Sequence, residues 1–216
     1  MPSGSPSAVR TEAAWARQLL CAAEIVDAVT LQPVTDKIVV RATGLSHAPF
    51  VNASGFHVWL EEGGAKPTLI TVDASQTEYS DADSAPPAPP QKSVRIELAP
   101  TYAYRFPPGA TAFRGRLLQS RYGTPKPLAG STVRLQWSGD YGWTDAPTSV
   151  SCNANGDFAA PLRFSSNDKP TLTDAKLTAR LRVTRGGVTR TSDEFALARG
   201  FVSAAAQSFF WDDLNP

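Results

Sequence analysis

Hydrophobic and polar residues alternate with a period of two along many short stretches of this chain. That period is typical of β-strands whose two faces meet different surroundings, whereas a helix repeats about every 3.6 residues. The predicted strands cover residues 20–27, 37–43, 56–62, 67–75, 92–100, 113–120, 131–137, 177–184 and 188–197. Two short segments, 11–20 and 204–207, are also compatible with a helix. We therefore predict an all-β fold.

The stretch FHVWLEE shows how the alternation assigns faces. Phe56, Val58 and Leu60 occupy one set of alternating positions, and His57 and Trp59 occupy the other. Because the first set is apolar throughout, we predict that it faces the core, while His57 and Trp59 face outward. This assignment makes Trp59 a candidate for contact with a partner.

Glycine and asparagine mark the turns between strands. Asn155 and Gly156 tolerate a positive φ and predict a hairpin within VSCNANGDFAAPLRF, and the Gly-Gly pair at 186–187 predicts another. Residues 81–91, with four prolines, and residues 138–149, with glycines and a proline, have the composition of loops.

The length of 216 residues suits two β domains of about 100 residues each. The segment TYAYRFPPGAT, with two prolines and a glycine, forms a natural boundary, and its three aromatic residues indicate that it packs against something. The predicted organisation is a flexible N-terminal segment over 1–16, a β-sandwich over 17–100, a linker over 101–111, a second β-sandwich over 112–199 and an aromatic C-terminal tail over 200–216.

The two halves of the chain repeat the same phrase. IVD before LQPV in the first half matches LLQ before PKPL in the second, and KIVVRA matches STVRLQW. Val34 and Leu128 are 94 residues apart, and Gly55 and Gly156 are 101 residues apart, so a modest loop insertion separates the two alignments. A period of about 100 residues indicates duplicated domains rather than a solenoid.

The second half carries this phrase most fully, in Gly123, Pro127, Leu128, Gly130, Val133, Leu135, Asn155, Gly156 and Phe158. It resembles the carboxypeptidase regulatory-like domain, a small transthyretin-like or Ig-like β-sandwich. The first half resembles this family less closely, because Thr35 and Asp36 stand where a glycine is usual. The resemblance covers most of residues 17–200. It implies two tandem sandwiches whose motif residues are scaffold residues, used for assembly or binding without catalysis.

Charge and cysteine content exclude several classes of function. The net charge is +1, so no global field favours nucleic acid, and no apolar run is long enough to insert in a membrane. Arg180 and Arg182 share one face of a predicted strand, which we interpret as a solvated surface because no aromatic platform is interleaved there. Cys21 and Cys152 are expected to be buried free thiols, with a disulfide between the domains as the less favoured alternative.

Residues suited to catalysis or metal binding are few. The sequence lacks the G-x-S-x-G, Walker A and H-E-x-x-H motifs, so no catalytic residue is predicted and an enzyme is not expected. Asp81 and Asp83 carry oxygens that calcium could use, but they lack EF-hand spacing, and a solvated loop is the favoured interpretation. We predict neither a metal nor another cofactor.

Aromatic residues that the two cores cannot all hold are the candidates for partner binding: Trp59, Tyr141, Trp143, Phe209, Phe210 and Trp211. The last three close the chain, and two interpretations of them stay open. The tail folds back over its own sandwich as a latch, or it docks on another subunit.

Two functions from different classes fit these features. The first is a non-enzymatic structural protein that binds the other protein subunits of a large assembly through its loops and terminal segments. The N-terminus lacks the pattern of a secretory signal, which predicts a cytoplasmic protein. With the resemblance, this favours a component of a phage tail or contractile injection particle. The alternative is a carbohydrate-binding module of an exported protein, which would use Trp59, Tyr141 and Trp143.

Overall fold

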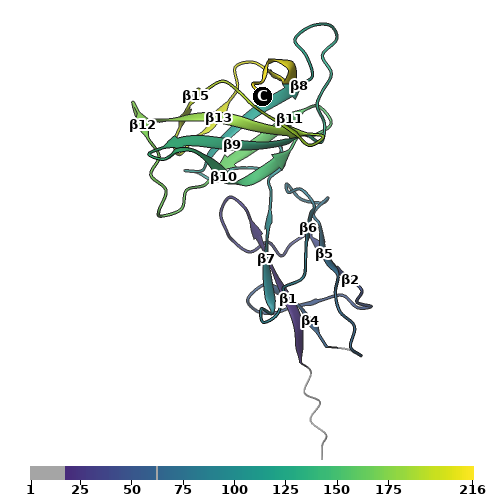
Figure 1. Cartoon of the computed structure of the whole chain (residues 1–216). Coiled ribbons are helices and arrows are strands. Elements are labelled where there is room, and N and C mark those ends of the chain that lie inside the picture. The colour runs from purple at the N-terminus through teal and green to yellow at the C-terminus, as the bar shows by residue number, and fades with distance from the viewer. Residues whose placement is uncertain (1–17, 62) are drawn as a thin grey trace, which may run out of the picture.

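The computed structural model describes residues 18–61 and 63–216, and over this part the chain is all-β (Figure 1). The expectation for residues 1–16 lies outside the described residues. The strands form two tandem β-sandwiches, which lie one above the other in Figure 1. None of the described residues belongs to a helix long and apolar enough to cross a membrane. The predicted fold class is confirmed.

The first sandwich contains two sheets. One has four strands in the order β3 (Phe50–Val51), β4 (Phe56–Leu60), β1 (Leu19–Asp27) and β7 (Ser93–Leu98). The facing sheet has three, in the order β2 (Val39–Thr43), β5 (Leu69–Asp73) and β6 (Ala82–Ser84). Both sheets contribute to one core, which includes Cys21, Ile25, Trp59, Ile70 and Leu98.

The second sandwich is larger. Its first sheet has the order β10 (Gly142–Ser151), β9 (Thr132–Gly139), β13 (Lys176–Arg185) and β12 (Leu172–Thr173), and β13 also pairs with β14 (Val188–Thr191) and β15 (Phe195–Ala198). The facing sheet has the order β11 (Asp157–Leu162), β8 (Thr111–Leu118) and β16 (Val202–Ala204), and β8 also pairs with β17 (Phe209–Phe210). A short 3-10 helix, η1 (Trp211–Asp213), follows β17.

The sequence repeat corresponds to a structural repeat. Strand β1 pairs antiparallel with β4 and parallel with β7, and β8 likewise pairs antiparallel with β11 and parallel with β16 and β17. Asn52 and Asn153 precede β4 and β11. In each case the side-chain Oδ1 accepts hydrogen bonds of 2.9–3.0 Å from the backbone amides two and four residues later. The equivalent strands β4 and β11 are therefore each preceded by the same kind of asparagine turn.

Strand β4 faces the opposite way from the prediction. His57 and Trp59 are 4% and 0% exposed, whereas Phe56 is only half-buried. The pairing with β1 explains this, because His57 lies beside Ala23 and Trp59 beside Cys21, two small core residues that leave space for larger rings. The alternation in FHVWLEE was read correctly as a strand, but its inward face was assigned wrongly.

Residues 138–149, predicted as a loop, instead form most of the hairpin β9–β10. Ala146, Thr148 and Val150 alternate as buried positions of β10, and an irregularity in the pairing between Asp145 and Ser149 contains Pro147. The alternation is not evident in the sequence because its buried positions include Ala146 and Thr148, which are small or polar. The irregularity accommodates Pro147, since a strand tolerates proline at a bulge. The predicted loop over 81–91 similarly contains the short strand β6.

The C-terminal tail is part of the second sandwich. Strands β16 and β17 extend the sheet beside β8, and Trp211 and Leu214 belong to the buried core. Parallel pairing of this kind joins strands distant in sequence, which local pattern does not reveal. The boundary predicted at residue 199 therefore falls inside the second sandwich, and the tail takes the latch position.

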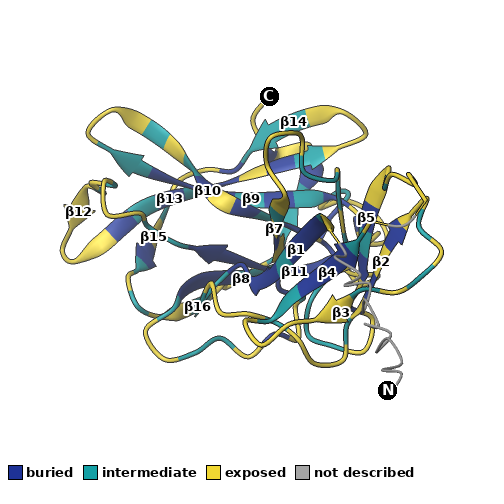
Figure 2. Cartoon of the chain, turned by 90° about the horizontal axis from the view of Figure 1, so that it is seen from below, coloured by how far each residue is buried: buried dark blue, intermediate teal, exposed yellow. Residues whose placement is uncertain are grey.

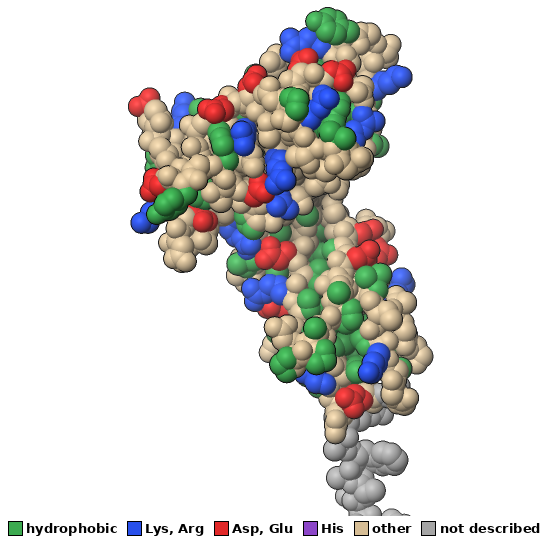
Figure 3. All heavy atoms as spheres, in the orientation of Figure 1, with side chains coloured by type: hydrophobic (Ala, Val, Ile, Leu, Met, Phe, Trp, Pro, Cys, Tyr) green, Lys and Arg blue, Asp and Glu red, His purple; other side chains and the backbone are tan. Residues whose placement is uncertain are grey.

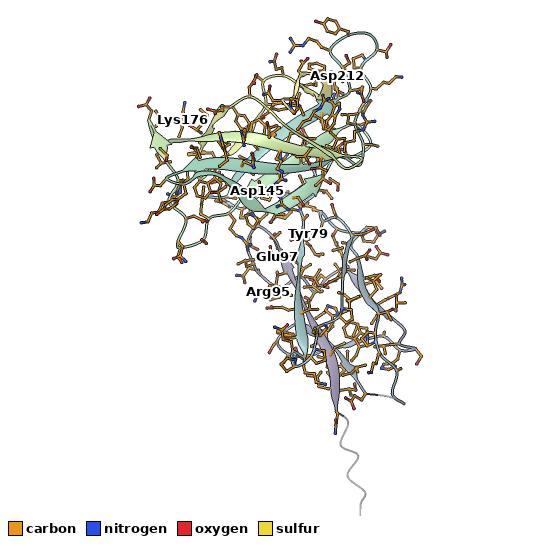
Figure 4. All side chains as sticks on the ribbon, viewed as in Figure 1. Tyr79, Arg95, Glu97, Asp145, Lys176 and Asp212 are labelled. Atoms are coloured by element: carbon orange, nitrogen blue, oxygen red, sulfur yellow. The ribbon has the colours of Figure 1, made fainter. Side chains whose placement is uncertain are left out.

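The linker predicted over 101–111 is packed between the sandwiches. The buried Tyr104 donates its hydroxyl to Asp27 Oδ2 at 2.6 Å, and Arg114 Nη2 donates to the Tyr104 backbone oxygen at 2.6 Å. Burial, reinforced by the Asp27 carboxylate, raises the pKa of Tyr104 far above its usual value, so the hydroxyl remains a donor. Arg163 of the second sandwich also contacts Glu97 at 3.1 Å, and Glu97 is labelled on β7 in Figure 4.

Candidate functional site

Two of the six aromatic candidates for partner binding are buried. Trp59 is 0% exposed and belongs to the first core, and Trp211 is 8% exposed and belongs to the second. Arg190 secures Trp211, because its guanidinium lies 4.9 Å from the ring centroid and its Nη1 donates to the Trp211 oxygen at 2.9 Å. Trp59 and Trp211 are therefore structural residues, and their prediction as contact residues is corrected.

Phe209 and Phe210 are half-buried on the tail. The ring centroids of Phe209 and Phe113 are 5.9 Å apart, and Phe209 also packs on Phe195 at 6.4 Å. Arg121 lies over the ring of Phe210 at 5.4 Å. Each phenylalanine thus has partners within its own sandwich, which is the arrangement expected of a latch.

Tyr141 and Trp143 lie on the second sandwich, next to the turn between β9 and β10. Tyr141 is fully exposed, and Trp143 is half-buried with the Arg180 guanidinium 4.2 Å from its ring centroid. Because Trp59 lies in the core of the other sandwich, the three aromatics proposed for carbohydrate recognition do not form one surface. Tyr141 and Trp143 stay accessible on the second sandwich, whereas Trp59 is not accessible to a ligand.

The outer face of the four-stranded sheet in the first sandwich carries an apolar surface that the sequence reading missed. Phe50, Val58 and Ala22 follow one another across β3, β4 and β1. They line a hollow of about 430 Å³ together with Leu19 and Phe56, and its lining is completed by the polar residues Asn52, Ser54, Lys92 and Ser93. We call the five apolar residues the apolar face, in which Ala22 and Val58 are only 6% and 8% exposed.

The most exposed part of the apolar face is the edge strand β3, visible in yellow in Figure 2. Phe50 is 50% exposed, and its neighbour Val51 is 49% exposed. The sequence signal for this surface was the adjacent apolar pair Phe50 and Val51 inside the predicted loop GLSHAPFVNASG. The reversed facing of β4 then adds Phe56 and Val58 to the same surface.

The outer face of β9, β10 and β13 in the second sandwich is charged instead. Asp145 Oδ2 contacts Arg182 Nη1 at 2.6 Å and Arg134 Nη1 at 3.6 Å. Gln136 Nε2 donates to Asp145 Oδ1 at 2.7 Å, and Gln136 Oε1 accepts from Arg180 Nε at 2.7 Å. We call these five residues the arginine face. Figure 3 shows Lys and Arg side chains around an acidic one in this region, where Figure 4 labels Asp145.

The prediction that no aromatic residue lies among the arginines of this strand face is wrong. Arg180 and Arg182 do share the outer face of their strand, as predicted, but Trp143 lies directly against Arg180. This contact could not be predicted, because Trp143 lies in the stretch that was predicted to be a loop. An aromatic ring is thus interleaved with the arginines.

The side chains of His57, Cys21 and Cys152 are buried and belong to neither face. Burial lowers the pKa of His57, which favours its neutral form. Cys21 and Cys152 are free and buried, as predicted, and burial raises the pKa of Cys152 to about 12. A thiol with so high a pKa is a poor nucleophile at neutral pH.

The acidic residues proposed as calcium ligands have structural surroundings. Asp81 Oδ1 accepts a hydrogen bond of 2.8 Å from the backbone amide of Ala74, and Asp83 lies on the short strand β6. Across residues 18–61 and 63–216, no group of three or more His, Cys, Asp or Glu side chains could hold a metal ion.

Comparisons with known proteins do not assign this chain to a family. No family model matches it, and no curated protein matches it. It is similar to the crystal structure of GBS52, the minor pilin of Streptococcus agalactiae, at 10% identity and a TM-score of 0.29. The match covers 73% of this chain and 64% of the pilin. A similarity at that TM-score carries no argument about function. The chain is an all-β protein of two tandem β-sandwiches.

Proposed function

We propose that this protein is a non-enzymatic structural subunit that binds neighbouring protein subunits of a large assembly. The observation that carries the proposal is the apolar face with its exposed edge strand β3. Exposed apolar surface next to an unpaired strand edge promotes association, and single-chain proteins usually cover or charge such edges. Phe50 and Val51 leave this edge apolar.

The chemistry of the apolar face favours a protein segment as the occupant. Among the described strands β3 pairs with β4 alone, so its outer backbone groups can accept a further strand. Phe50 is the exposed member of an apolar row beside that edge, and Val58 and Ala22, which are 8% and 6% exposed, form its floor. A strand of a neighbouring subunit would gain backbone hydrogen bonds at β3 and bury alternate side chains on the row. We infer a phage tail or contractile injection particle as the kind of assembly, on the resemblance of both halves to carboxypeptidase regulatory-like domains.

The test compares native particle mass between variants of the apolar face. We expect the protein from its own host to sediment in a particle far larger than its 23.1 kDa. The double substitution Phe50→Ser with Val51→Ser should release it as a monomer. Val188→Ser, which removes an apolar side chain 53% exposed on the second sandwich, is the matched control and should leave the particle intact.

Two outcomes would contradict this proposal. A wild-type protein that sediments as a monomer shows that it is not an assembly subunit. A double variant that stays in the particle shows that neighbours bind elsewhere. Circular dichroism of the purified variants checks that each keeps its strand content.

A further inference from the structure

A small hollow opens on the outer surface of the second sandwich and includes two residues of the arginine face. Its volume is about 180 Å³, and its lining consists of Thr132, Arg134, Ser149, Arg182 and Thr184. The strand register explains why these residues meet. Arg134 lies directly opposite Arg182 and Ser149, and Thr132 lies directly opposite Thr184. Two guanidinium groups and three hydroxyl groups therefore surround one space.

The charges around this hollow are not balanced. Like charges placed directly opposite one another on neighbouring strands are destabilising. Asp145 compensates Arg182 closely, at 2.6 Å, whereas its 3.6 Å distance to Arg134 is too long for a hydrogen bond. Arg180 adds a third positive charge to the same network, through Gln136. Three guanidinium groups thus lie around one carboxylate, and only Arg182 and Arg134 contact it, which leaves positive charge for an anion to neutralise.

We propose that this hollow binds a tetrahedral oxyanion, the sulfate or phosphate group of a ligand. Arg134 and Arg182 present planar donor groups, which suit the oxygens of such anions. The hydroxyls of Thr132, Ser149 and Thr184 can each donate one further hydrogen bond. A bound oxyanion would relieve the repulsion between Arg134 and Arg182. The site is independent of the apolar face, which lies on the other sandwich.

The test is an NMR titration of the full chain with sodium sulfate and with sodium phosphate, at an ionic strength held constant with sodium chloride. We expect saturable shifts of the backbone amides around Thr132, Arg134 and Arg182. Arg134→Gln should weaken binding about tenfold or more, which is the range for loss of one hydrogen bond between charged groups. Arg134 is the suitable position, because Asp145 keeps its closer contact to Arg182.

The matched control is Lys176→Gln, which removes one positive charge from the start of β13, the strand that also carries Arg182. It should leave the sulfate affinity unchanged. Lys176 lies at the far end of the sheet from the hollow, as Figure 4 shows with Asp145 as the reference. A loss that is equal in Arg134→Gln and Lys176→Gln would show general charge attraction and would overturn the proposal.

A second titration with a heparin-derived oligosaccharide separates the two sources of the oxyanion. Tighter binding than inorganic sulfate, lost with Arg134→Gln, assigns the site to a sulfate group on a polymer. Binding no tighter than inorganic sulfate assigns it to a free ion. Absence of saturable shifts with all three probes would overturn the proposal.

Discussion

The two sandwiches place different residues at equivalent positions of one scaffold. Gly115 lies opposite Phe158 in the second sandwich, and Ala23 lies opposite His57 in the first. A Cβ atom on Gly115 would lie 2.6 Å from Phe158 Cζ, so the large ring requires glycine as its neighbour. The smaller imidazole tolerates an alanine. Each repeat thus carries its own matched pair, while strand pairing and turns preserve the shared topology.

The outer faces differ in the same way. The first sandwich exposes the apolar face beside an edge strand, and the second exposes the arginine face on its larger sheet. Inward-facing residues are constrained by the core in both repeats, whereas outward-facing residues are free to acquire separate roles. The two proposals above place protein contacts on one repeat and anion binding on the other.

The largest expected difference between the repeats follows from the C-terminal tail. Deleting residues 200–216 removes β16, β17, Trp211 and Leu214 from the second sandwich. Loss of one buried aromatic side chain alone costs about 3–5 kcal/mol, against a total domain stability of about 5–15 kcal/mol. We predict that the second sandwich unfolds and that the first keeps its dispersed NMR signals. Phe201→Ser, at a residue 67% exposed, should leave both folded. Two intact sandwiches in the truncated chain would show that the tail is dispensable.

The asparagine turns allow a sharper comparison between the repeats. Gly55 and Gly156 have φ values of 82° and 77°, so valine strains the backbone at either site. A Cβ on Gly156 would lie 2.2 Å from the Leu117 backbone oxygen, whereas one on Gly55 would lie 3.4 Å from Thr35 Cγ2. Gly55→Val should cost about 1–3 kcal/mol from strain, and Gly156→Val should cost about 4 kcal/mol or more. Urea denaturation of both variants measures the two costs. Equal losses would show that the collision at Gly156 is relieved by backbone movement.

The smallest predicted effect concerns the pH dependence of the first sandwich. Burial lowers the folded-state pKa of His57 from its usual 6.5, so the unfolded chain takes up a proton more readily. The contribution of neutral His57 to stability is fully present when the pH is above the unfolded-state pKa of 6.5. This contribution is lost as the pH falls below 6.5 toward the lower folded-state pKa. We expect the melting temperature of the first sandwich to decrease between pH 7.5 and pH 5.5, values chosen on either side of the ordinary histidine pKa. His57→Leu should flatten this dependence. An unchanged profile in His57→Leu would assign the dependence to other groups.

Much of the fold could be predicted from local sequence. The alternating runs located most strands, and the hairpin predicted at Gly186 and Gly187 is confirmed by the pairing of β13 with β14. The hairpin predicted at Asn155 and Gly156 is wrong: a turn with a positive φ at Gly156 does form there, but it joins β10 to β11, which belong to different sheets. The repeated phrase correctly indicated two tandem sandwiches. These features follow from interactions between residues that are near one another in the chain, which is why pattern and turn chemistry identify them.

The candidate surfaces could not be predicted, because they depend on pairings between distant residues. The facing of β4 was decided by its register with β1, which buried Trp59 and left Phe56 half-buried on the outer face. The contact of Trp143 with Arg180 required β10, β9 and β13 to lie side by side. The tail became part of the second core through parallel pairing with β8, about 90 residues earlier in the chain. The sequence by itself determined where strands and turns form, since these are local preferences. The tertiary structure decided which side of each strand meets the core, since that choice depends on the shape of its neighbours.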